Sequence, residues 1–345
     1  MNIYVGIFAA VIILGLSVHR KAKLQAAYAS ALLLFLFAFS AFRFEVGCDW
    51  FTYEMLFDLY STFPLWEASA TREPGFYLML SILGGVGMPY VWANILTTAV
   101  LCLGVYNLSK TQPNRLGFVL LCFPFLFIVM AMSGIRQAAA IGFICVALYH
   151  VFNRKLMVAL IWVILATAFH NSSAVFFLFI PFISIQKTRY KILFLSVVGP
   201  IVAYLILRSA AFDIALDRYV DTGFDAAGAY ARISLLGISS AMMLFYRKRW
   251  RSRFPEDYRF IVISAFAMLL LVPLTAFSTV IGDRIGYYFI PLQAIIFSRM
   301  VYLEKGLTLM YVGSLPYVMM EAALYVWATR SSLFQSCYLP YQTIF

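Results

Sequence analysis

Long runs of apolar residues, separated by short polar breaks, fill most of the chain. A helix needs about 20 mostly apolar residues to cross a bilayer, and runs near that length recur along the sequence. We predict spanning helices near residues 2–18, 24–42, 88–108, 116–132, 137–152, 156–169, 173–186, 192–207, 232–246, 259–281, 285–302 and 307–327. The pattern predicts an all-α integral membrane protein with about 12 transmembrane helices.

Two stretches between these runs are long enough to carry structure, residues 43–87 and 208–231. In the first, residues 49–74 mix large apolar and acidic residues, which is typical of short amphipathic helices in the membrane interface. Residues 75–86 are apolar but too few to span, so they predict a surface or re-entrant helix. The second stretch predicts a mobile loop or lid. We expect residues 1–345 to form a single polytopic membrane domain.

The composition supports this class and narrows the partners. Hydrophobic residues make up 63% of the chain and charged residues 12%, whereas soluble domains carry about 25% charged residues. The net charge of +11 does not indicate nucleic acid as a partner, because the basic residues lie in short loops between spans. The first apolar run lacks a basic segment before it, so it predicts a span and not a signal peptide.

The charged residues divide between two faces. All eight lysines and eight arginines fall in alternate loops, which the positive-inside rule assigns to the cytoplasm. The opposite, outer loops hold eight arginines, no lysine and eleven of the fifteen acidic residues. Guanidinium groups bind phosphates and carboxylates bidentately and stay charged when partly buried. The outer arginines therefore point to an anionic ligand, with avoidance of lysine for topology as the simpler alternative.

Four outer arginines stand at predicted helix ends and are candidate ligands for a phosphate group: Arg43, Arg136, Arg232 and Arg284. The segment 43–53 carries more charge than the end of a span requires and predicts the floor of a polar site. Arg136 has a simpler explanation as a snorkelling arginine. Asp283 and Arg284 can likewise form an ion pair that only orders a loop.

Three side chains are candidate general bases. His170 is the only histidine on the predicted outer face, and histidine suits this role because it titrates near neutral pH. A helix-end histidine bonded to its own backbone is the alternative. Asp49 is the second candidate and Asp283 the third. Glu321 lies within the last predicted span, where an ionisable group is costly, so we expect it to form a buried pair.

Several kinds of site are not indicated. The chain lacks the common nucleotide-binding and hydrolase motifs. Its histidines and cysteines lack the spacing of metal ligands, so we expect no cofactor and no protein-built metal site. Cys48 and Cys337 fall in outer loops and can pair if that side is oxidising.

A set of short motifs resembles the EpsG family of bacterial polysaccharide polymerases, which is grouped with the Wzy-type O-antigen polymerases. The motifs are Arg43-x3-Gly47-x-Asp49-x3-Tyr53, Glu73-Pro-Gly-Phe76, Arg136-Gln137, His170-Asn-Ser-Ser173, Asp283-Arg284 with Tyr287-Tyr-Phe289, and Pro340-Tyr341. Each is weak alone, but their order, spacing and shared outer face are specific. The resemblance runs from about residue 40 to the end of the chain.

The resemblance implies a GT-C-like helical fold and a glycosyltransferase at the periplasmic face of the bacterial inner membrane. Such enzymes move a growing glycan from undecaprenyl diphosphate to a new lipid-linked repeat unit. Neither a nucleotide sugar nor an obligatory metal is implied. A polysaccharide co-polymerase, which regulates chain length, is the expected protein partner, and membrane lipid surrounds the spans.

This chemistry suggests roles for the candidate residues. The four arginines would stabilise the departing diphosphate, and His170, Asp49 or Asp283 would accept the proton of the acceptor hydroxyl. The expected glycan-binding residues are Glu45, Trp50, Tyr53, Glu73 and Tyr341, with orientation of an arginine as the alternative role of the two glutamates. Loop 208–231 would close over the glycans and exclude water.

Two other functions stay open. An O-antigen ligase, or another lipid-linked glycosyltransferase of the outer face, would use the same donor with a different acceptor. A transporter or flippase of lipid-linked oligosaccharide would need charges distributed through its spans, whereas the charges here gather at one face.

Overall fold

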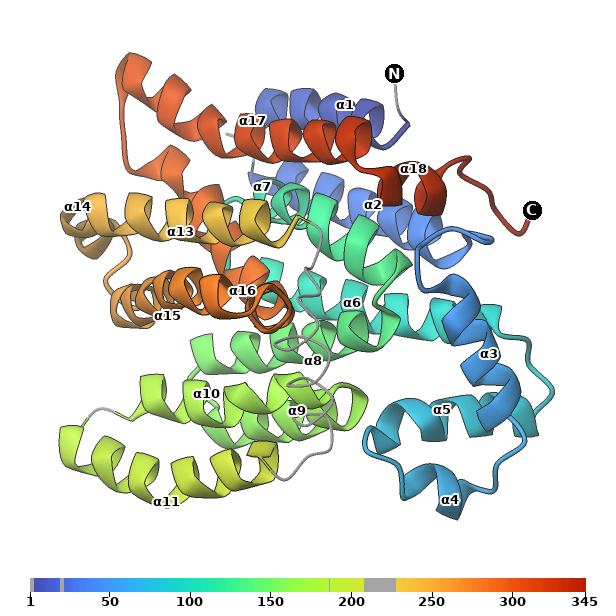
Figure 1. Cartoon of the computed structure of the whole chain (residues 1–345). Coiled ribbons are helices and arrows are strands. Elements are labelled where there is room, and N and C mark those ends of the chain that lie inside the picture. Colours follow the sequence, from blue (N-terminus) through green and yellow to red (C-terminus); the bar gives the residue numbers. More distant parts are fainter. Residues whose placement is uncertain (1–2, 19–21, 186, 208–227) are drawn as a thin grey trace.

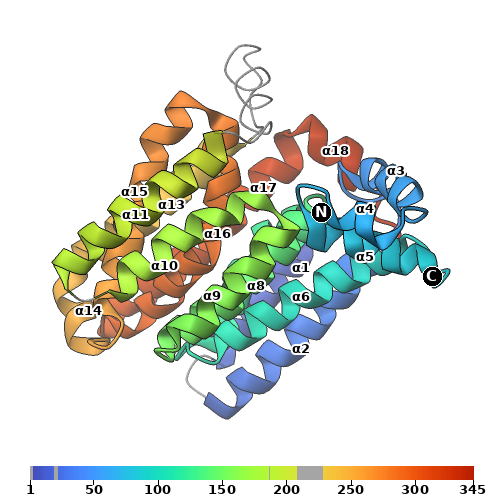
Figure 2. The ribbon, with the colours of Figure 1, turned by 90° about the horizontal axis from the view of Figure 1, so that it is seen from below.

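The computed structural model describes residues 3–18, 22–185, 187–207 and 228–345. Its helices lie side by side in a bundle, with α3 and α18 at one end and α14 at the other (Figures 1 and 2). We call these the site end and the basic end. The elements are α1 (Ile3–Val18), α2 (Ala22–Ala41), α3 (Trp50–Tyr60), α4 (Leu65–Ser69), α5 (Pro74–Gly85), α6 (Val91–Ser109), α7 (Arg115–Cys122), the π-helix η1 (Phe123–Met130), α8 (Ile135–Phe152), α9 (Leu156–Phe169), the 3-10 helix η2 (Asn171–Val175), α10 (Phe176–Ser184), α11 (Thr188–Leu207), α13 (Ala229–Phe245), α14 (Arg247–Arg253), α15 (Tyr258–Phe277), α16 (Thr279–Arg299), the 3-10 helix η4 (Met300–Tyr302), α17 (Gly306–Arg330) and α18 (Ser332–Tyr338).

The helices identify an α-helical membrane protein. Within the described residues, four helical segments are long and apolar enough to cross a membrane: Leu24–Ala41 in α2, and α6, α8 and α15. The pair α13 and α14, bent by 72°, makes a fifth if it is one span. Other predicted runs consist of two consecutive short helices, α7 with η1 and η2 with α10. Length and composition thus support four or five spans directly, fewer than the 12 predicted.

The outer segments follow the sequence pattern in part. The predicted short helix 75–86 is α5, and residues 49–74 contain the two short helices α3 and α4. In the stretch 208–231, α13 begins at Ala229, and the remainder of the predicted lid, residues 208–227, lies outside the described residues.

Two boundaries differ from the prediction. Helix α16 begins at Thr279 and not near 285, because the Ser278 hydroxyl caps it by accepting a hydrogen bond from the Ile281 N–H. Asp283 and Arg284 therefore lie inside the helix, one turn from its start. Residues 247–253, predicted as a loop, form α14 around the fully buried Trp250.

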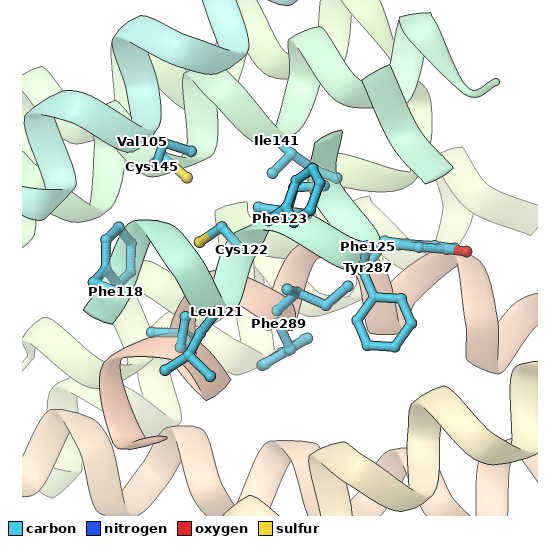
Figure 3. Packing of buried hydrophobic residues seen from close by; sticks show 14 of the residues in the cluster. Val105, Phe118, Leu121, Cys122, Phe123, Phe125, Ile141, Cys145, Tyr287 and Phe289 are labelled. Atoms are coloured by element: carbon cyan, nitrogen blue, oxygen red, sulfur yellow. The ribbon is translucent and has the colours of Figure 1, made fainter. Parts of the chain in front are cut away.

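The centre of the bundle is the continuous segment α7–η1, which is almost wholly buried. Figure 3 shows its side chains packed against others from α6, α8 and α16. Pro124 lies at the start of η1 and has no N–H to continue the α-helical bonding, which suits the wider π turn. Helices α6 and α8 touch through Gly104 and Gly142, where an added Cβ on Gly104 would lie 2.1 Å from the Gly142 carbonyl oxygen. This central packing fixes α8, which carries the predicted site residue Arg136.

At the basic end, a buried arginine joins three parts of the chain. Arg299, at the end of α16, is only 2% exposed. Its Nε donates to Gln112 Oε1 at 2.9 Å, and its Nη1 pairs with Asp257. The guanidinium also lies 4.8 Å from the centre of the Phe254 ring.

Replacing Arg299 with alanine is expected to destabilise the protein by about 3–5 kcal/mol, because it leaves Asp257 without its ionic partner in a site shielded from water. Thermal unfolding of the detergent-solubilised protein measures this loss. Lys248→Gln, an exposed residue of α14, is the matched control and should melt like the wild type. Equal melting temperatures for all three proteins would show that this pair does not stabilise the basic end.

Candidate functional site

The carboxylate of Glu73, at the start of α5, is the centre of a hydrogen-bonded cluster at the site end. Its Oε2 accepts from Arg136 Nη1 at 2.6 Å, and its Oε1 lies 2.7 Å from His170 Nδ1. The Asn171 backbone N–H donates to the same Oε1 at 3.2 Å. The Glu73 side chain is 8% exposed. One carboxylate therefore joins residues that are far apart in the sequence and that we predicted separately as base and phosphate ligand.

The cluster leaves one donor and one ring nitrogen unused. Because the ionised Glu73 accepts at Nδ1 of His170, that nitrogen carries a proton, and in the neutral imidazole the lone pair is on Nε2. Within the described residues, His170 Nε2 and Arg136 Nη2 have no hydrogen-bond partner. Neither atom is among the buried polar atoms that lack one, so both reach the protein surface. A basic nitrogen and a cationic donor are therefore both open to solvent beside the same carboxylate.

Two tyrosines complete the surroundings of Arg136. Its Nε donates to Tyr53 OH and its Nη1 to Tyr77 OH, both at 3.4 Å. The guanidinium also lies 5.6 Å from the centre of the Tyr53 ring. Tyr77 was not among our candidates. Its position four residues after Glu73 on α5, which places both on one helix face, is the signal that could have identified it.

The ionisation of Glu73 depends on these neighbours. Burial would raise the pKa of this carboxyl, but the hydrogen bond and charge of His170, the charge of Arg136 and the Asn171 N–H together lower it to about 2. Glu73 is therefore ionised at every physiological pH and holds both His170 and Arg136 in place.

Replacing Glu73 with glutamine should lower the melting temperature in a pH-dependent way. The folded-state pKa lies below the ordinary value of 4.5, so the ionised form contributes about 3 kcal/mol, an order-of-magnitude value. This contribution is complete above pH 4.5 and is lost as the pH falls towards 2. Melting curves of wild type and Glu73→Gln between about pH 7 and pH 3 should differ by a constant amount near neutrality and converge in acid. A gap that stays constant down to the lowest pH would contradict this assignment.

Asp49 lies near two of the predicted arginines. Its side chain is exposed at the position before α3. Neighbouring protein atoms still remove part of the water around the carboxyl, which raises its pKa, and the charges of Arg136 and Arg284 oppose that rise. Arg284 is exposed on α16, and its carbonyl oxygen accepts from Gln137 Nε2 at 2.6 Å. The side chain of Gln137, next to Arg136 in the sequence, is thereby tied to the backbone of Arg284, and the charges of both arginines act on Asp49.

Arg232 and Asp283 form a bidentate ion pair between α13 and α16. Arg232 Nε and Nη2 donate to the two carboxylate oxygens at 2.7 and 2.8 Å, and both side chains are 11% exposed. The guanidinium lies 5.2 Å from the centre of the Tyr287 ring. Asp283, considered as a base from the sequence, therefore already accepts two charge-assisted hydrogen bonds. The pair fixes the helix from which the next residue, Arg284, projects.

Arg43 is fully buried under the site. Its guanidinium donates to the carbonyl oxygens of Ser40, Val46 and Met132 at 2.7 to 3.1 Å and to Asn94 Oδ1 at 3.0 Å. These contacts order residues 40–47 against α6 and the start of α8. Since Arg43 is 0% exposed, this position does not fit direct contact with a phosphate, the role expected for it. The buried amide Asn94 was not predicted, although a polar residue within an apolar helix is a usable signal.

The turn below Asp49 depends on Gly47. Its φ is +108°, and an added Cβ would lie 1.9 Å from the Met132 carbonyl oxygen. Only glycine fits this contact, which explains the glycine of the Arg43–Tyr53 motif.

The expected sugar-binding residues occupy different environments. Trp50 and Tyr53 are 1% and 6% exposed, so their rings are covered by protein and do not fit stacking on a sugar. Tyr341 stacks on Phe39, with ring centres 4.5 Å apart, and donates to the Phe39 carbonyl oxygen at 2.8 Å. Glu45 is exposed at a turn with φ of +52°. Of the proposed glycan-binding carboxylates, only Glu73 belongs to the cluster.

Cys48 and Cys337 form a disulfide, the pairing that the sequence left open. The described residues contain no group of three or more His, Cys, Asp or Glu side chains that could hold a metal ion. Glu321 is half-buried in α17, where its Oε2 has no hydrogen-bond partner and no ionic partner lies among the described residues. The expected buried pair at Glu321 is therefore not found.

Comparison with known proteins gives one finding. A sequence model described as the EpsG family matches residues 26–343. This match covers every site residue described above. No curated protein and no solved structure shows a significant match.

Proposed function

This chain belongs to the EpsG family, and from that premise we propose that it elongates a polysaccharide by transferring a glycan from a lipid diphosphate. Members of the family are Wzy-like polymerases or glycosyltransferases, and the chain is a polysaccharide polymerase-like membrane enzyme. The proposed donor is a growing glycan on undecaprenyl diphosphate, and the proposed acceptor is a new lipid-linked repeat unit. The observation that carries the proposal is the Glu73 cluster, in which a candidate base and a candidate phosphate ligand share one carboxylate.

Glycosyl transfer requires a proton acceptor and a ligand for the leaving diphosphate, and His170 and Arg136 of the cluster are the candidates. The acceptor hydroxyl oxygen bonds to the anomeric carbon of the donor sugar, and the bond from that carbon to the diphosphate oxygen breaks. The proton of the hydroxyl passes to His170 Nε2, while Glu73 holds Nδ1–H and favours the imidazolium that forms. Glu73 is thus a positioning residue and His170 the base.

The leaving group needs the arginines. Negative charge grows on the diphosphate as the sugar departs, and cationic donors fixed in advance lower that barrier most. The open Nη2 of Arg136 and the exposed Arg284, whose charges both act on Asp49, are the proposed ligands. Arg232 and Asp283 position Arg284, and Arg43 orders the floor. This assigns direct phosphate contact to two of the four predicted arginines.

We also propose the setting of this reaction. The site end faces the outer, periplasmic side of the bacterial inner membrane, which the disulfide supports because disulfides persist in oxidising compartments. In this proposal the shorter apolar helices also cross the membrane, beside the four or five spans that are long enough on their own. Together they would form a GT-C-like bundle of about 12 transmembrane helices. A polysaccharide co-polymerase would contact this bundle and set the chain length.

The test is the surface polysaccharide of cells that make the matching repeat unit. Single alanine variants of Asp49, Arg136, His170 and Arg284 should leave surface lipid that carries one repeat unit, with chain elongation lost. A ligase would instead leave long, unattached chains on their lipid carrier, and a flippase would leave repeat units on the inner face. Long attached chains in all four variants would overturn the site.

A further inference from the structure

The carboxy-terminal strap, residues 331–345, lies against the turn that precedes Asp49. Antiparallel backbone hydrogen bonds join Phe44 N–H to Gln342 O at 2.9 Å and Ile344 N–H to Phe42 O at 3.0 Å. Gly47 N–H donates to Cys337 O at 2.7 Å. The Cys48–Cys337 disulfide then joins the two segments covalently across 289 residues of sequence. In Figure 1 the blue α2–α3 connection and the red α18 meet at the site end.

The strap also reaches the site through Ser133. The Ser133 hydroxyl accepts from the Cys48 N–H at 2.8 Å and lies 2.9 Å from Tyr338 OH, with which it shares a hydrogen bond. Cys48 is the residue before Asp49, and Ser133 lies three residues before Arg136. The strap therefore touches the turn that carries one site residue and the start of the helix that carries another.

Tyr338 is the buried end of this connection. It is 1% exposed, and its carbonyl oxygen accepts from Tyr4 OH of α1 at 3.0 Å. The charges of Asp49, Arg43 and Arg232 all act on its hydroxyl. Tyr338 thus links both ends of the chain to the site, a role that was not predicted from the sequence.

The disulfide is the contact that can change. Terminal segments are ordered only when they are tied down, and a few backbone hydrogen bonds at the surface open easily. A crosslink between Cys48 and Cys337 keeps the strap on the turn even when those bonds open. Reduction would leave the turn held by Arg43 and Ser133 on one side, and on the other only by hydrogen bonds to the strap.

We propose that the oxidised strap is a positioning element, and that the Cys48–Cys337 bond is required to hold Asp49 beside Arg136 and Arg284. This extends the proposed function. The two thiols lose two protons and two electrons to a dithiol–disulfide oxidase or another disulfide oxidant, and a dithiol reductant reverses the step. The site is then complete only after the chain reaches an oxidising compartment.

Hydrogen exchange tests the positioning without reference to activity. The purified protein is compared before and after reduction with dithiothreitol, and the free thiols are counted by alkylation. Reduction should release two thiols and lower amide protection at residues 44–50 and 133–136, while protection in α6 and α15 stays constant. A second protein, with Cys102, Cys122 and Cys145 replaced by serine, should respond in the same way. Unchanged protection at residues 44–50 after both thiols are released would overturn the proposal.

Elongation by the same samples tests the consequence, at a temperature well below the melting temperature of the reduced protein. Reduction should slow chain elongation at least about tenfold, and reoxidation should restore it. The Cys48→Ala/Cys337→Ala variant should be slow and insensitive to dithiothreitol. If the reduced protein elongates as fast as the oxidised protein, the positioning role of the strap is refuted, but the proposed function is not. Oxidised protein that never elongates refutes the proposed function, while hydrogen exchange still decides the role of the strap.

Discussion

Replacing His170 with alanine is expected to slow chain elongation by about 10²–10⁴-fold, which is the usual contribution of a positioned general base. The variant removes the only open ring nitrogen of the Glu73 cluster and leaves the Arg136–Glu73 pair in place. The rate is measured with purified protein and a lipid-diphosphate-linked repeat unit, by the length of the glycan formed with time. Added imidazole should restore part of the rate, because it can occupy the space and accept the proton.

The control for this prediction is His150, which lies near the opposite end of α8. His150→Ala should elongate at the wild-type rate. Glu73→Gln should also be slow, and combining it with His170→Ala should cost little more than His170→Ala alone, because the two residues act as one unit. Full activity of His170→Ala, with no effect of imidazole, would transfer the role of base to Asp49.

The second large effect is expected at Arg136. Arg136→Ala should reduce elongation by about 10²–10³-fold, the loss seen when one donor to a developing negative charge is removed. It also leaves Glu73 with one charged partner fewer. Arg136→Lys should recover part of the rate, because lysine keeps the charge but cannot place donors on Glu73 and a phosphate at the same time.

Arg72 provides the matched control for Arg136. It is exposed, it lies next to Glu73 in the sequence, and it has no ion pair among the described residues. Arg72→Ala should elongate normally and melt like the wild type. If Arg72→Ala and Arg136→Ala lose activity to the same degree, net positive charge at this end matters more than the geometry of the cluster.

The sequence was sufficient to predict that the site residues gather at one end of the bundle. Ionisable groups are costly inside a bilayer, so Glu73, Arg136 and His170 had to lie near helix ends. Helix periodicity and length also identified α5 as a short helix, and the Pro74 that follows Glu73 marks its start. These features depend on local chemistry and on the solvent, both of which can be inferred from the sequence.

The pairing of charges could not be predicted in the same way. Arg43 and Arg136 look alike in the sequence as outer arginines. In the structure Arg43 is buried and donates to carbonyl oxygens, whereas Arg136 keeps Nη2 without a partner among the described residues. Which carboxylate accepts from Arg232 depends on the packing of α13 against α16. The burial of Trp50 likewise depends on Tyr90 and on the cation of Arg43 above it. Such contacts join segments far apart in the chain, and periodicity carries no information about them.

The most direct test measures bond formation and carrier release together. Purified protein in lipid nanodiscs receives only lipid-diphosphate-linked repeat units, with no nucleotide sugar. We predict a ladder of lengthened glycans and one released lipid diphosphate for each bond formed, with both lost in His170→Ala and Arg136→Ala and both retained in Arg72→Ala. Glycan growth that requires a nucleotide sugar, or no growth by a folded, oxidised protein, would contradict the account.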